Sequence, residues 1–103
     1  MPCHGSDFVS VALFQSSVIP KQERLSHDEA CGIARQVLRD LGPRTVVIDM
    51  RNAREITTAA FARLVLLRRR LRAQGRDLHL SNLRGKAASL YQINRLDAVL
   101  PLH

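Results

Sequence analysis

Apolar residues recur at helical spacing in two segments of the chain. From Ser26 to about Leu41 they lie three and four residues apart, and Ser26 and Glu29 form a capping box that marks where this helix begins. A second stripe predicts a helix over Thr58–Ala73, followed by Gly75, a residue type that often ends helices. Each helix then needs a sheet or another helix against which to bury its apolar face.

Other segments have strand patterns. Residues 8–14 (FVSVALF) are rich in β-branched and aromatic residues, and a second short strand begins near Val18. Residues 45–50 (TVVIDM) form a nearly continuous apolar run, which is typical of a central strand buried on both faces. Residues 77–81 (DLHLS) alternate between apolar and polar. The order strand, helix, strand over residues 45–81 predicts a right-handed parallel crossover.

The C-terminal quarter adds a third helix, over about Gly85–Gln92, with Asn94 as a left-handed residue after it and a short final strand over Ala98–Leu100. These elements together predict an α/β fold. Because the chain has no Trp and few other aromatic residues, its core must be aliphatic. We expect the core to contain Val46, Val47, Ile48, Ile33, Val37, Leu64, Leu67, Leu71, Leu78 and Leu80.

Length and composition fit one intracellular domain. With 103 residues and 46% apolar residues, the chain can bury one core, so we expect a single domain over residues 1–103 with residues 1–7 as a disordered tail. Cys3 and Cys31 form no CxxC motif, which indicates a reducing compartment. Residues 8–14 are too few to cross a bilayer and no basic segment precedes them, so we expect a cytoplasmic protein without membrane insertion.

The charge is strongly basic, with 16 Lys and Arg against 9 Asp and Glu and a net charge of +7. Such a charge serves solubility and indicates an acidic partner, but no nucleic-acid reading motif or aromatic stacking platform accompanies it, so we expect no specific nucleic acid. A group of arginines surrounds the apolar stripe of the second helix. A solvated face is the favoured interpretation, and a docking surface for an acidic partner or RNA is the alternative; the group comprises Arg63, Arg68, Arg69, Arg70, Arg72 and Arg76.

Motifs for catalysis are missing. The sequence contains no GxSxG, GxxxxGK[ST] or GxGxxG motif and no pair of carboxylates with a catalytic spacing, which argues against hydrolase, nucleotide-binding and glycosidase activities. We interpret the cysteines and the four histidines as sharing no helical i, i+3 or i, i+4 ligand spacing, and Cys3-His4 stands alone. We therefore expect no enzymatic activity, no metal site and no cofactor.

Three polar residues stand at positions that suit a functional site. Asp49 ends the buried strand, where open α/β sheets often place functional groups, although a carboxylate bonded to backbone amides of the next loop is the favoured interpretation. Thr57 and Thr58 begin the second helix, where a hydroxyl ordinarily caps free amides. The same position favours a phosphate, because helix N-termini attract negative charge.

Residues 45–101 resemble the STAS domain, the family named for sulfate transporters and anti-sigma factor antagonists. The resemblance lies in the strand VVIDM, the helix opening ITTAAFARL, the segment DLHLSNL and the ending INRLDAVLP. It implies a single domain with a mixed four- to five-stranded sheet and helices mainly on one face. The earlier strand and helix fit the family's order, without its usual glycine and acidic motif there.

The resemblance also implies a function. Stand-alone STAS proteins commonly bind an anti-sigma factor that is itself a serine-protein kinase, and they are switched off by phosphorylation of a residue that matches Thr58. Where the family usually has an Asp before that residue and a small residue and Gly after it, this chain has Thr57, Ala59 and Ala60. The implied partner-binding residues are Asp49, Thr57, Thr58, Ala59, Phe61, Ala62 and Arg63.

Two other functions stay open. Some STAS proteins are cytoplasmic subunits that bind the ATPase of a phospholipid-trafficking ABC transporter through the same helix, with an unphosphorylated Thr, and the ending LYQINRLDAVLP resembles that subgroup equally. A basic nucleic-acid-binding domain built on the arginines is the third candidate. The sequence leaves the partner's identity, the input signal and the oligomeric state open.

Overall fold

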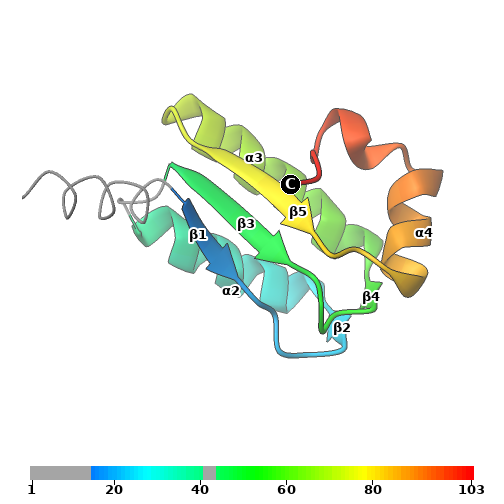
Figure 1. The fold of residues 1–103 in the computed structure, drawn as a ribbon. Helices are drawn as coiled ribbons and strands as arrows, with labels where there is room; N and C mark the ends of the chain where they lie inside the picture. The colour runs from blue at the N-terminus through cyan, green and yellow to red at the C-terminus, as the bar shows by residue number, and fades with distance from the viewer. Residues whose placement is uncertain (1–14, 41–43) are drawn as a thin grey trace, which may run out of the picture.

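The computed structural model describes residues 15–40 and 44–103, which form two layers (Figure 1). One layer is a three-stranded parallel sheet, and helices α2 and α3 lie behind it on one face. A two-stranded sheet and helix α4 lie at the end where the longer strands terminate. In chain order the elements are β1 (Gln15–Val18), β2 (Arg24–Leu25), α2 (His27–Arg39), β3 (Thr45–Asp49), β4 (Glu55–Ile56), α3 (Thr58–Ala73), β5 (Asp77–Ser81), α4 (Gly85–Ile93) and the 3-10 turn η1 (Leu96–Ala98).

Strand β3 is the central strand of the larger sheet, with β1 on one side and β5 on the other, both parallel to it. Val46 and Ile48 belong to the core under the helices. Val47 points to the opposite face and is still buried, with 4% of its surface exposed. The predicted burial of this strand on both faces is therefore confirmed, as are the parallel pairing of β3 with β5 and the α/β fold class.

The two short strands β2 and β4 position the start of α3. They pair in parallel, and their second residues, Leu25 and Ile56, are both buried. The Thr57 amide donates a hydrogen bond to the Leu25 carbonyl at 3.1 Å, so the residue just before α3 is tied to the chain just before α2. This pair was not predicted, because two-residue strands have no periodicity in the sequence.

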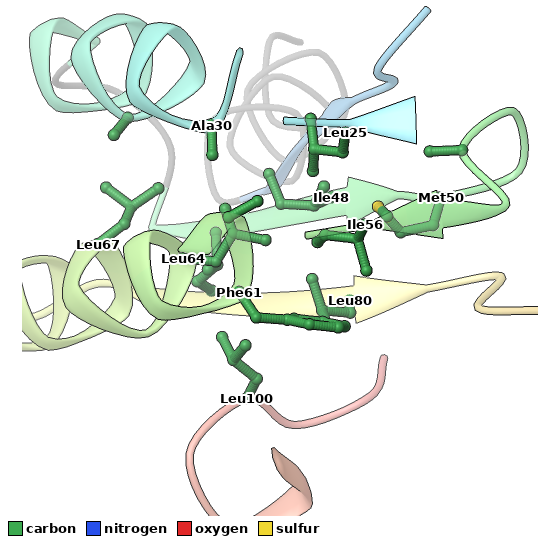
Figure 2. Close-up of a cluster of buried hydrophobic side chains, with 14 of the residues drawn as sticks. Leu25, Ala30, Ile48, Met50, Ile56, Phe61, Leu64, Leu67, Leu80 and Leu100 are labelled. Atoms are coloured by element: carbon green, nitrogen blue, oxygen red, sulfur yellow. The ribbon is translucent and has the colours of Figure 1, made fainter. Parts of the chain in front are cut away.

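A single core lies between the sheet and the helices (Figure 2). Phe61 and Leu64 from α3 lie against Ile48 and Leu80 from the strands, and Leu100 closes the cluster from the C-terminal segment. Nine of the ten predicted core residues are buried. The exception, Ile33, packs against the cluster but is only partly buried.

The helix boundaries agree closely with the sequence pattern. Ser26 caps α2, because its hydroxyl accepts a hydrogen bond from the Glu29 amide at 3.3 Å, as the capping box predicts. Helix α2 ends at Arg39, two residues earlier than expected. Gly75 follows α3 with a φ of +76°, the left-handed conformation that glycine adopts without strain. The predicted strand over residues 8–14 lies outside the described residues.

Two predictions for the C-terminal segment are wrong. Asn94 has a φ of −90°, and the left-handed residue is its neighbour Arg95, with a φ of +51°. Residues 98–100 form no strand, since the chain turns through η1 there.

Tertiary contacts explain this path. Leu100 is fully buried, and its carbonyl accepts a hydrogen bond from the Tyr91 hydroxyl at 2.6 Å. The chain is thereby anchored beside α4 before Leu102 forms a parallel bridge with Leu80 of β5.

Candidate functional site

An apolar groove runs along α3 and faces the segment that follows α4. It has a volume of about 500 Å³. Thr58, Ala62 and Leu66 recur every four residues along one face of α3 and form one wall, while the segment around η1 forms the other. The lining residues are Thr58, Phe61, Ala62, Val65, Leu66, Asn94 and Leu96.

The two threonines at the start of α3 have different roles. Thr57 is the N-cap, and its Oγ1 accepts a hydrogen bond from the Ala60 amide at 3.0 Å. Thr58 is the first helical residue, is exposed, and lies at the end of the groove. The prediction that these two threonines begin the second helix is confirmed. The capping bond belongs to Thr57, so Thr58 is free of that structural task.

The other implied partner-binding residues of this helix differ in exposure. Ala59 and Ala62 are exposed, and their small side chains leave the first turns of α3 open to a partner. Phe61 is 2% exposed and forms the floor of the groove, where its ring lies 6.4 Å from that of Tyr91. Arg63 is half-buried, and its buried Nε has no hydrogen-bond partner among the described residues.

Asp49 has the structural role that the sequence analysis favoured. Its Oδ1 accepts hydrogen bonds from the Arg51 amide at 3.0 Å and from Asn82 Nδ2 at 2.9 Å, and its Oδ2 accepts from Arg51 Nε at 2.9 Å and Nη2 at 2.6 Å. The Arg51 and Asn82 hydrogen bonds lower the pKa of Asp49 from 3.8 to about 2. With 6% of its surface exposed, Asp49 offers little surface for direct contact.

The arginines of α3 do not form one solvated face. Arg68 is largely buried, and its Nε donates a hydrogen bond to Asp77 Oδ1 at 2.8 Å. Burial is the largest single influence on Asp77 and raises its pKa, but the hydrogen bonds from Arg68, the Leu78 amide and His79, together with the positive charge of Arg68, outweigh burial and lower the pKa. Arg76 is also buried. The favoured interpretation is therefore wrong for Arg68, Arg76 and the half-buried Arg63, and correct for the exposed Arg69, Arg70 and Arg72.

Histidine and cysteine contacts lie away from the groove. The interpretation that no His and Cys share a helical ligand spacing is wrong, because His27 and Cys31 are four residues apart on α2, with Cys31 Sγ 3.6 Å from His27 Nε2. His79 and His103 approach with Nδ1 atoms 3.5 Å apart on the sheet. Among residues 15–40 and 44–103, no three His, Cys, Asp or Glu side chains come together in a way that would hold a metal ion.

Comparisons with known proteins agree with this architecture. The family profile described as "STAS domain" matches residues 5–103. The chain belongs to the STAS domain family. STAS domains in general are protein-interaction and regulatory modules. No protein with a curated description matches the chain significantly.

Solved structures share the fold of this STAS domain. The NMR structure of the protein TM1081 superimposes with a TM-score of 0.72 at 13% identity, covering 86% of this chain and 73% of that one. The crystal structure of a sulfate transporter family protein from Wolinella succinogenes has a TM-score of 0.69 at 16% identity, with 84% and 72% covered. At these identities the likeness establishes the fold alone. Among the described helices, none combines the length and the apolar character needed to span a bilayer.

The structure brings together more residues than the sequence indicated. Thr58, Phe61 and Ala62 lie in the groove, whereas Asp49 lies in a separate network at the strand ends. Four lining residues were not predicted: Val65, Leu66, Asn94 and Leu96. Val65 and Leu66 were detectable, because they lie four residues after Phe61 and Ala62 on the same face of α3. Asn94 and Leu96 reach the groove only through tertiary packing.

Proposed function

We propose that this STAS domain is a cytoplasmic, non-catalytic anti-sigma factor antagonist that binds a kinase-type anti-sigma factor through the start of α3 and the groove beside it. The observation that carries the proposal is the position of Thr58. Its side chain is exposed at the end of the groove, while Thr57 makes the capping bond. A kinase can therefore modify Thr58 without removing a group that the helix needs.

Phosphorylation of Thr58 would act on binding more than on folding. A phosphate adds about −1.5 to −2 charge at neutral pH. The free amides at the start of α3 stabilise that charge, so the helix itself tolerates it. At the end of an apolar groove, however, the phosphate stays hydrated and blocks the approach of an apolar partner surface. The phosphorylated domain would then release its partner while remaining folded.

A second candidate function is supported by the first turn of α3. This turn contains no acidic residue, and the exposed Ala59 stands beside Thr58. A surface of this kind suits a partner that binds permanently to an unphosphorylated Thr. The corresponding proposal is a subunit that binds the ATPase of a phospholipid-trafficking ABC transporter through the same face of α3.

One experiment separates the two proposals. The chain is co-expressed, in parallel, with each kinase-type anti-sigma factor and each ABC ATPase encoded in the same genome, and complexes are isolated by size-exclusion chromatography. Complexes with a kinase are incubated with ATP, and the modified residue is mapped by mass spectrometry. We expect a stable complex with a kinase, phosphate on Thr58, and dissociation after modification.

Variants of the two threonines provide matched controls. Thr58→Glu should stay folded and lose the partner, whereas Thr58→Ala should keep the partner and accept no phosphate. Thr57→Ala should lower stability by about 1 kcal/mol through loss of the cap, with phosphorylation still on Thr58. The second candidate would be favoured by a stable complex with an ABC ATPase that does not dissociate when ATP and a kinase are added. Equal partner binding by wild type, Thr58→Ala and Thr58→Glu would refute the switch.

A further inference from the structure

The groove beside α3 has a basic rim around an apolar floor. With about 100° between successive residues of an α-helix, Arg69 lies within about 20° of Thr58 around the α3 axis, one turn beyond the lining residues Val65 and Leu66. Arg69 and Arg70 are exposed. On the opposite wall, Arg95 is exposed between the lining residues Asn94 and Leu96.

Apolar side chains are exposed in the groove and at the residue that precedes its second wall in the sequence. Leu66 has 46% of its surface exposed and Ile93, just before the lining residue Asn94, has 77%. Arg95 holds a left-handed backbone conformation with a φ of +51°, which is uncommon for a residue other than glycine. This conformation turns the chain after α4, so that Asn94 and Leu96 both line the groove.

We propose that the occupant of this groove is an acidic amphipathic helix of a protein partner. One wall is helix α3 and the other is the turn that leads from Asn94 into η1, so neither wall offers a strand edge for pairing. A partner can therefore bind only by inserting side chains, as a helix does with apolar residues at positions i, i+3, i+4 and i+7. The inference rests on the proposed function and specifies the chemistry of its partner.

The charge around the groove favours a negatively charged partner. It disfavours a second copy of this chain as the occupant. Arg69 and Arg95 would face the flanks of the inserted helix, where carboxylates would be attracted and basic groups repelled. Asp97, exposed at η1, is the acidic residue nearest in sequence to the lining residues. A second copy would bring a net charge of +7 against a rim of the same sign.

The test uses designed peptides and the full chain labelled with ¹⁵N. The probe is a blocked 20-residue helical peptide with Leu at i, i+3, i+4 and i+7 and Glu on its flanks. Its charge-reversed counterpart carries Lys in place of every Glu, and a scrambled peptide has the same composition without the Leu stripe. Binding is followed by amide chemical shifts and fluorescence anisotropy.

We expect only the acidic amphipathic peptide to bind, with shift changes centred on Ala62, Leu66 and Leu96. Leu66→Glu should weaken binding at least tenfold, whereas Ile19→Glu, a change at an exposed apolar residue outside the groove, should leave it within twofold. Arg69→Glu should weaken binding about fivefold, and Arg35→Glu, at an exposed position on α2, should not.

Three results would overturn the inference. They are no binding of the acidic peptide at millimolar concentration, equal binding of the Lys peptide, or shift changes centred away from the groove. Under any of these results, a kinase partner could still bind the wild-type chain and fail to bind the Thr58→Glu variant. The proposed function would then stand without this inference. The two proposals therefore fail separately.

Discussion

Replacing Asp49 by Asn tests how the ends of β3 and β5 are held together. The Asp49 carboxylate joins Arg51 in the loop after β3 to Asn82 after β5. Asn keeps the shape of the side chain but loses the charge and one of the two acceptor oxygens. The donors on Arg51 and Asn82 then compete for the one remaining acceptor.

The pKa of Asp49 gives the magnitude of the effect. Folding lowers this pKa from 3.8 to about 2, and one pKa unit corresponds to about 1.4 kcal/mol, so ionised Asp49 stabilises the fold by at most about 2.5 kcal/mol. The Arg51 side chain is 54% exposed, so solvent screening reduces this value. We expect Asp49→Asn to lower the free energy of unfolding by about 1 to 2 kcal/mol at pH 7.

The sign of the pH dependence follows from the direction of the shift. Because the pKa is lower in the folded state than in the unfolded state, the contribution is complete above about pH 5 and is lost as the pH falls from about 4 to 2. At pH 3 roughly half of it remains. The stability difference between wild type and Asp49→Asn should therefore shrink by about half between pH 7 and pH 3.

Urea unfolding followed by far-UV circular dichroism measures both quantities, with linear extrapolation to water at each pH. Asp97→Asn, a change at an exposed carboxylate, is the matched control and should alter stability by less than about 0.5 kcal/mol. The reasoning is refuted if Asp49→Asn is as stable as wild type at pH 7. A stability difference that is equal at pH 7 and pH 3 would also contradict it.

Two further predictions concern the core and the charge. Leu64 is fully buried between α3 and the sheet, and its replacement by Ala should lower the free energy of unfolding by about 2 to 5 kcal/mol. A decrease below about 1 kcal/mol in urea unfolding would show that the core is assigned wrongly. Nucleic-acid binding should be weak, indifferent to sequence and steeply salt-dependent, because surface arginines supply only phosphate contacts. Tight binding in a mobility-shift assay at physiological salt would instead support the nucleic-acid-binding candidate.

Local patterns in the sequence were sufficient to predict most of the longer helices and strands. Apolar spacing and the Ser26 capping box located α2, and the bounds predicted for α3 and β5 agree with the structure. These features depend on residues close together in the chain, so periodicity and capping chemistry reveal them. Thr58 was placed beside the helix cap on the same local evidence.

Other features were decided by contacts between distant residues. The β2–β4 pair, the bond from Asn82 to Asp49 and the ion pair between Arg68 and Asp77 each join segments that local periodicity treats separately. Sequence spacing placed Arg68 on a solvated face, yet the approach of β5 buries it against a carboxylate.

The groove shows most clearly which features follow from local sequence and which follow from tertiary packing. The sequence by itself determined one wall, since the spacing of Thr58, Ala62 and Leu66 places these residues on one face of a helix. The second wall exists because Leu100 is buried and Tyr91 bonds to its carbonyl, which brings the turn with Asn94 and Leu96 beside α3. A binding surface made by two segments depends on how they pack together, and the apolar spacing within either segment alone does not specify that packing.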